Sequence, residues 1–122
     1  MLVTRFEDLE VWQIARNIAN SIYQLTYNQQ FSKDFALKDQ VRRSAISIMA
    51  NIAEGFGSKS KNEFIRFLRY SISSAAETKS HLYLAIDLDY ITQDQFNECA
   101  GNIETVTKKI KAFIKHINKT KE

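Results

Sequence analysis

The chain has no proline and only three glycines among its 122 residues, so few positions oblige a helix to end. A single cysteine, Cys99, excludes a disulfide bond within one chain, and one cysteine with two histidines falls short of a structural zinc site. No segment approaches the run of about 18 apolar residues that spans a membrane, and the first residues lack the apolar stretch of a signal peptide. We therefore expect a cytoplasmic protein without a membrane partner.

Sequence motifs of catalysis are missing as well. The chain has no nucleophile elbow, P-loop, metalloprotease helix motif or dinucleotide fingerprint. His81 and His116 have no second metal ligand three or four residues further along the chain, and Cys99 lies among apolar positions, which predicts a core side chain. The glycines of residues 55–58 follow a helical segment rather than a strand, which favours a helix end over a phosphate-binding loop. We expect no enzyme activity, no catalytic residue, no cofactor and no metal.

The apolar residues recur at helical spacing throughout the chain, and no window alternates with a period of two. Ser60 and Thr92 each begin a capping box, which marks the start of a helix. The pattern predicts a single domain over 1–122 with helices at about 8–27, 35–54, 61–87 and 93–118. Because the connections are short, we expect an all-α fold, an antiparallel up-down-up-down four-helix bundle.

The apolar faces of the first two helices are wider than a minimal core stripe requires. The second helix has two adjoining apolar stripes, one of Val41, Ile48 and Ile52, the other of Ile46, Met49 and Ala53. Two explanations remain open for the second stripe. It either provides extra side coverage of the bundle or contacts another copy of the chain.

Charge is unevenly distributed along the chain. Residues 80–104 carry five acidic side chains and no lysine or arginine, whereas residues 105–122 carry six lysines and one glutamate. Lys108, Lys111, Lys115 and Lys119 share one helix face, opposite the apolar one. A second basic group surrounds the start of the third helix and consists of Lys59, Lys61, Arg66 and Arg69. We expect these eight side chains to contact nucleic acid, and the alternative is that they serve solubility alone.

Small polar residues line another face of the second and third helices. An arginine at the margin of an apolar face favours a carboxylate partner. We expect Arg42 or Arg43 to pair with Glu54 or Glu77, within or between chains, and the alternative is a solvated face without partners. The predicted polar network or interface comprises Arg42, Arg43, Asn51, Glu54 and Glu77.

Two segments, residues 6–12 (FEDLEVW) and residues 40–57 (QVRRSAISIMANIAEGFG), resemble the signature blocks of a known protein family. Residues 63–68 and 74–77 fit the same family. It is the S23 family of four-helix bundle proteins, also called 23S rRNA intervening-sequence proteins because some are encoded within insertions in bacterial 23S rRNA genes. The resemblance covers nearly the whole chain.

The resemblance implies a cyclic homo-pentamer with a central channel and no enzyme activity. A related group, the accessory variability determinants of diversity-generating retroelements, forms a similar basic pentamer that works with a reverse transcriptase and its RNA. The partners implied are therefore further copies of the chain, RNA or another nucleic acid, and a reverse transcriptase or another protein.

Three functions compete on these observations. The first is an oligomeric RNA-binding accessory protein, which would contact backbone phosphates because the chain has no motif for reading bases. The second is a structural scaffold or adaptor that binds another protein. The third is an enzyme with a pocket assembled between subunits. The first predicts binding of single-stranded RNA that weakens as salt rises and has no strong sequence preference.

Overall fold

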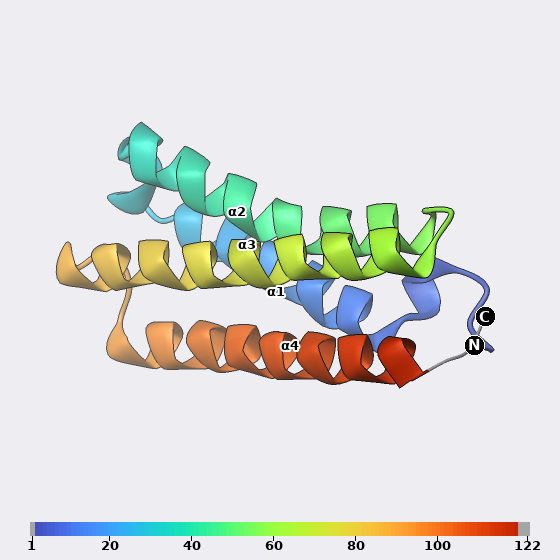
Figure 1. Ribbon diagram of the computed structural model, residues 1–122. Coiled ribbons are helices and arrows are strands. Elements are labelled where there is room, and N and C mark those ends of the chain that lie inside the picture. The colour runs from blue at the N-terminus through green and yellow to red at the C-terminus, as the bar shows by residue number, and fades with distance from the viewer. Residues whose placement is uncertain (1, 120–122) are drawn as a thin grey trace.

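The computed structural model describes residues 2–119, and its regular elements are all helical (Figure 1). Their bounds are η1 Phe6–Asp8, α1 Glu10–Thr26, η2 Phe31–Lys33, α2 Phe35–Phe56, α3 Lys61–Asp87 and α4 Gln93–Lys119. Each long helix packs against its neighbours in sequence, and α1 also packs against α4, which closes the bundle. This arrangement confirms the predicted all-α four-helix bundle. None of the helices in the described range has both the length and the apolar character that a membrane crossing needs.

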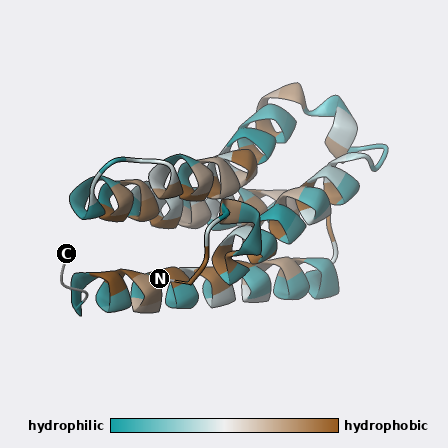
Figure 2. Cartoon of the chain, turned by 90° about the vertical axis from the view of Figure 1, so that its right-hand side faces the viewer, coloured by the Kyte–Doolittle hydropathy of each residue, from teal (hydrophilic) through white to brown (hydrophobic). Residues whose placement is uncertain are grey.

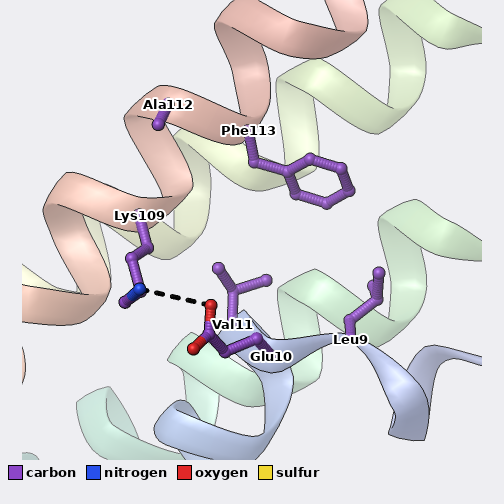
Figure 3. Close-up of a pocket in the computed structure, with 6 residues that line it drawn as sticks. All are labelled: Leu9, Glu10, Val11, Lys109, Ala112 and Phe113. Carbon is purple, nitrogen blue, oxygen red and sulfur yellow. Dashed lines mark ion pairs between the residues drawn. The ribbon is translucent and has the colours of Figure 1, made fainter.

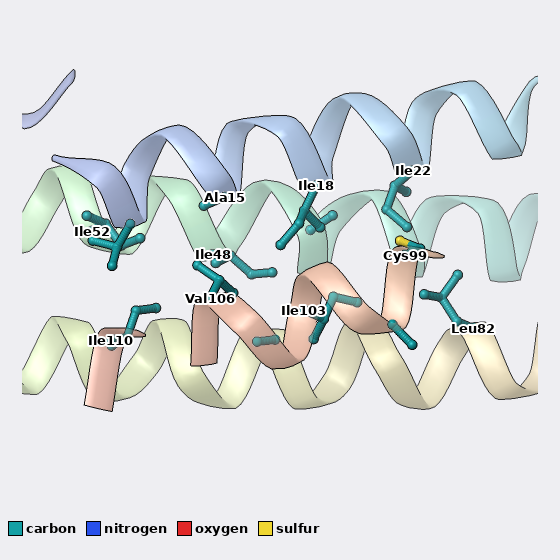
Figure 4. Close-up of a cluster of buried hydrophobic side chains, with 14 of the residues drawn as sticks. Ala15, Ile18, Ile22, Ile48, Ile52, Leu82, Cys99, Ile103, Val106 and Ile110 are labelled. Atoms are coloured by element: carbon teal, nitrogen blue, oxygen red, sulfur yellow. The ribbon is translucent and has the colours of Figure 1, made fainter. Parts of the chain in front are cut away.

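Buried hydrophobic residues recur along each long helix, where hydrophobic and hydrophilic segments alternate along the ribbon (Figure 2). The centre of the core is formed by aliphatic side chains from all four long helices (Figure 4). Fully buried examples are Ile18, Ile22, Ile48, Ile52, Leu82, Ile103, Val106 and Ile110. Cys99 is buried among them, as the sequence predicts.

Gly55 has a different role from the one that the sequence suggests. Expected as part of a helix end, it lies inside α2, which continues to Phe56 and has Gly57 as its C-cap. A Cβ atom on Gly55 would lie 2.8 Å from Phe67 Cβ and 3.2 Å from the carbonyl oxygen of Phe64. Gly55 therefore allows α2 and α3 to approach more closely than any other residue would permit.

Small polar side chains also line the α2–α3 interface. Thr78 donates a hydrogen bond to Ser44 Oγ (2.8 Å), and Ser74 is within hydrogen-bond distance of Ser47 Oγ (3.0 Å). Asn51, one of the predicted network residues, donates to both the carbonyl oxygen (2.8 Å) and the hydroxyl of Ser47 (2.9 Å). These bonds satisfy polar groups that would otherwise be costly to place between two helices.

The connections α1–α2 and α3–α4 meet at one end of the bundle. The ring of Tyr90 stacks on Phe31 at 5.2 Å, and its hydroxyl donates to Asp34 Oδ2 at 2.9 Å. Asn28 Nδ2 donates to the carbonyl oxygen of Tyr90 at 2.6 Å. The hydrogen bond to Asp34 raises the pKa of Tyr90, because it favours the neutral phenol.

At the start of the α3–α4 connection, α3 ends in a Schellman motif. The N–H of Tyr90 donates to the carbonyl oxygen of Ala85 (2.9 Å), and that of Asp89 donates to the carbonyl oxygen of Ile86 (3.0 Å). Asp89 has a φ of 59°, the left-handed conformation that glycine usually adopts at this position.

Candidate nucleic-acid interface

The α4 lysines are exposed along one side of the helix. Lys108, Lys111, Lys115 and Lys119 all face solvent, and none of them forms an ion pair with another residue of the described part. At 1.5 Å per residue, the row from Lys108 to Lys119 is about 16 Å long. Four full charges therefore project from a short surface.

The basic residues predicted near the start of α3 are less uniform. Arg69 is exposed and has no ion-pair partner within residues 2–119, and Lys59 is also exposed, whereas Lys61 is half-buried. Arg66 is bound by Glu63, with Nη2 2.7 Å from Oε2 and Nε 3.1 Å from Oε1. This pair lowers the pKa of Glu63 and raises that of Arg66, chiefly through their hydrogen bonds. Arg66 therefore adds less positive charge to the surface than Arg69 does.

A surface groove between α3 and α4 brings Arg69 of one predicted basic group together with Lys108 and Lys111 of the other. The remaining members of the two groups do not line it, namely Lys59, Lys61, Arg66, Lys115 and Lys119. One hollow of about 410 Å³ is lined by Arg69, Ile72, Ser73, Lys111 and Ile114. A second hollow of about 340 Å³ shares Ile72 and Lys111 with the first and is also lined by Ala76, Lys79, Ile103, Glu104, Thr107 and Lys108. We call the two hollows the basic groove. Cationic side chains from both helices flank an apolar floor, of which Ile72 is the centre.

Sequence reasoning did not identify Lys79 and Ile72 as part of this surface. Lys79 Nζ lies 3.4 Å from Glu104 Oε1, so this ion pair links α3 to α4 at one end of the groove. Lys79 lines the basic groove only because of the register between α3 and α4. A single sequence gives no signal for that register. Arg69 and Lys111, which the sequence did identify, line the same hollow.

Another hollow lies between the start of α1 and α4 (Figure 3). It has a volume of about 370 Å³ and is lined by Leu9, Glu10, Val11, Lys109, Ala112 and Phe113. Lys109 Nζ lies 3.2 Å from Glu10 Oε1 there, so its charge is already balanced. This hollow is therefore a poorer anion site than the basic groove.

Arg42 makes other contacts than those expected. Its Nε donates to Thr26 Oγ1 at 2.8 Å, and Cζ lies 4.2 Å from the ring centroid of Tyr23. Within one chain it therefore pairs with neither predicted carboxylate. Glu77 Oε2 instead lies 3.5 Å from His81 Nε2.

The other members of the predicted network are on the surface of α2. Arg43 and Glu54 are both exposed and form no ion pair within residues 2–119. A pairing of either residue with another chain stays a prediction.

A second surface lies where α1 and α2 meet, and we call it the α1–α2 face. On α2 it contains the apolar stripe of Ile46, Met49 and Ala53, and beside it lie Tyr23 of α1 and Tyr27, the C-cap of α1. Ile46 is 42% exposed, while Met49 and Ala53 are half-buried. The stripe thus lies at the surface of the monomer rather than in its core.

The remaining candidates for chemistry have ordinary structural environments. Burial raises the pKa of Cys99 to about 11, with a smaller contribution from Glu98, so the thiol stays protonated near neutral pH. Within residues 2–119, no three His, Cys, Asp or Glu side chains are grouped so that they could hold a metal ion.

Comparison with known proteins identifies a family and a solved structure that are similar to this chain. A family model described as 23S rRNA-intervening sequence protein matches residues 7–112, a range that includes every lining residue of the basic groove except Ile114. The chain is also similar to a crystal structure of a protein of unknown function from the S23 ribosomal protein family of Bacteroides thetaiotaomicron VPI-5482. The two chains are 31% identical, the match covers 86% of this chain and 98% of the other, and the TM-score is 0.79. No curated protein sequence matches the chain.

Proposed function

Because the chain belongs to the family of 23S rRNA-intervening sequence proteins, we propose that it is an oligomeric, non-enzymatic accessory protein that binds single-stranded RNA along the basic groove. The observation that carries the proposal is the convergence of Arg69, Lys108 and Lys111 on one groove without acidic partners in the described chain. Each cation placed against a phosphate releases a bound counterion, which is the main source of affinity in such complexes.

The form of the groove favours a single strand over a duplex. Its floor at Ile72 and Ile114 is apolar, so riboses or unstacked bases can lie on it while phosphates remain near the flanking cations. A duplex keeps its bases paired and offers only its backbone to a surface of this kind. No element of the described chain supplies a stacking sheet or a recognition-helix motif, so little sequence preference is expected.

The test replaces three lysines of α4 by glutamine, giving the variant Lys108→Gln/Lys111→Gln/Lys115→Gln. Binding of a fluorescent single-stranded RNA is followed by anisotropy as the salt concentration rises. If each lysine neutralises one phosphate, the slope of log K against log salt should become smaller by about 2, since each contact contributes about 0.7. Affinity near 50 mM salt should fall by at least about tenfold.

A control variant with the same charge change carries Arg16→Gln, Lys33→Gln and Lys38→Gln. These residues lie on α1, η2 and α2, outside the basic groove. The control should retain most of the affinity. Equal losses in the two variants would show that net charge and not the groove determines binding. Undetectable binding of the wild-type protein at about 50 mM salt would remove the RNA proposal.

The oligomeric part of the proposal rests on the α1–α2 face. Ile46 and Met49 present apolar area there that a second copy would cover. Light scattering coupled to gel filtration should give a mass several times 14.1 kDa, with five copies favoured by the family resemblance. Met49→Glu should weaken the assembly while helicity measured by circular dichroism persists. A monomeric wild type at micromolar concentration would contradict this part.

A protein-binding adaptor is the second candidate function. It is favoured by the large apolar side chains that remain exposed on α3 and at its C-cap, namely Tyr70, Tyr83, Leu84 and Leu88. If the RNA experiment fails, this function takes precedence.

A further inference from the structure

The outward side of α3 has a row of exposed residues at regular helical spacing. The row, which we call the α3 row, consists of Arg69, Ser73, Ala76, Ser80, Tyr83 and Asp87. Their spacing alternates between four and three residues, the pattern by which two helices pack along a seam. All six side chains are exposed, and the ring of Tyr83 also contacts Phe96 of α4.

The two ends of the α3 row carry opposite charges. It begins with a cation, Arg69, and ends with an anion, Asp87, and neither has an ion-pair partner among residues 2–119. The two residues are about 27 Å apart along a continuous helix, so they cannot reach each other in one copy. A second α3 running antiparallel would bring each of them opposite its complement.

We propose that the basic groove is also the docking site of a second copy of this chain, with the two α3 helices antiparallel about a two-fold axis. The α3 row is self-complementary under that rotation. The pairs formed between copies are Arg69 with Asp87, Ser73 with Tyr83, and Ala76 with Ser80, each occurring twice. A symmetric contact of this kind closes on itself and pairs two single chains, or pairs two five-copy rings when its two-fold axes are perpendicular to the ring axis.

The steric fit agrees with the charge pattern. Tyr83 is 52% exposed although its ring rests on Phe96 at 4.7 Å, so it forms a fixed projection. It would face Ser73 of the second copy, which lines the 410 Å³ hollow of the basic groove. The side chains at the centre of the seam, Ala76 and Ser80, are small, so the two helix backbones can approach closely.

The two α4 helices support the same orientation. The ion pair between Lys79 and Glu104 places the middle of α3 beside the middle of α4. A two-fold axis there brings the acidic start of α4, at Asp94, toward the basic end of the other α4, at Lys115. The segregation of charge between residues 80–104 and 105–122 is thereby explained as complementarity between copies.

Self-docking and RNA would compete, because both use Arg69 and the second copy would cover the basic groove. Docking of the second copy follows from the α3 row alone, whereas the competition rests on the proposed RNA function. Exposed ion pairs contribute little each, so the contact should be weak and strongly salt-dependent. The competition would then keep the groove covered until RNA displaces the second copy.

The experiment uses charge reversal and sedimentation equilibrium. Arg69→Asp places like charges opposite each other at two positions of the seam, and so does Asp87→Arg. If the α1–α2 face makes a five-copy ring, two docked rings give ten copies near 50 mM salt; without a ring, docking gives two copies. In either case each single variant should have half the wild-type mass, with dissociation of the docked copies favoured by about tenfold or more. The double variant Arg69→Asp/Asp87→Arg restores both pairs and should recover the wild-type mass.

Two further variants separate the seam from general effects. Lys33→Asp reverses an exposed charge on η2 and should leave the mass unchanged. Ser73→Trp fills the hollow expected to receive Tyr83 and should halve the mass without altering any charge. Circular dichroism of every variant verifies that the fold is intact.

The outcomes distinguish the two proposals. If both single reversals keep the wild-type mass, or if the double variant fails to recover it, the self-docking proposal is overturned. If the charge swap succeeds and a 20-nucleotide poly-uridine strand at 50 mM salt lowers the wild-type mass, docking and competition are both supported. If the swap succeeds and the same strand shows no binding by anisotropy, self-docking stands and the RNA function falls.

Discussion

Adding one methyl group at Gly55 should destabilise the bundle, although alanine is the better helix former. The added Cβ would lie 2.8 Å from Phe67 Cβ, 3.0 Å from Phe64 Cδ1 and 3.2 Å from the Phe64 carbonyl oxygen. Two of these three atoms belong to the backbone or lie next to it, so a rotamer change cannot relieve the overlap. The α3 helix must move instead, and its hydrogen bonds with α2 must lengthen.

The magnitude follows from two opposing contributions. Overpacking of a tight interface costs about 1–3 kcal/mol. Replacing glycine by alanine within a helix returns about 0.5–1 kcal/mol, because it reduces the entropy of the unfolded chain. Gly55→Ala should therefore lower the free energy of unfolding by about 1 kcal/mol, which corresponds to a Tm decrease of about 4 °C at this chain length.

Gly101 provides the matched control for this substitution. It lies inside α4, and no heavy atom is within 4 Å of the position its Cβ would take. Gly101→Ala should raise the free energy of unfolding by about 0.5–1 kcal/mol, so the same substitution has opposite signs at the two positions. Urea unfolding followed by circular dichroism measures both values. A Gly55→Ala variant as stable as the wild type would refute the argument that α2 and α3 depend on this close approach.

Two other predictions concern single side chains. Asp89→Gly should raise the free energy of unfolding by about 0.5 kcal/mol in the same urea experiment, because glycine adopts the left-handed conformation with less strain. Lower stability would mean that the Asp89 side chain has a favourable role that outweighs the strain. Cys99 should react with iodoacetamide at about pH 8 only after unfolding, since burial raises its pKa to about 11 in the folded protein. Rapid modification of the folded protein, followed by mass spectrometry, would contradict this.

Much of the fold follows from local patterns in the sequence. The spacing of apolar residues identifies four helices, and the side chains of Asp34, Ser60 and Thr92 accept hydrogen bonds from the backbone at the starts of α2, α3 and α4. Gly55 shows the limit of such patterns. A glycine near the end of an apolar run has the same local signature whether it ends a helix or accommodates a neighbouring one. Only the positions of Phe64 and Phe67 on α3 decide between the two roles.

For the candidate site too, some features follow from the sequence of one helix and others depend on how two helices pack. Exposure of Lys108 and Lys111 is a property of one helix and follows from its periodicity. The groove itself depends on the register between α3 and α4, which the pair Lys79–Glu104 reveals only in three dimensions. For Arg42, charge alone favours a carboxylate, but the register of α1 against α2 places Thr26 and two tyrosine rings closer.

The contacts of Tyr90 make the two ends of the bundle unequal. At one end, this residue joins the connection before α2 to the connection before α4 through Asp34 and Asn28. The opposite end has a single connection, residues 57–60, between α2 and α3. Local opening at the Tyr90 end must release both helical hairpins together, whereas the other end can fray one helix at a time. Amide hydrogens should therefore exchange more slowly around Tyr90, and unfolding should start from the far end of the bundle.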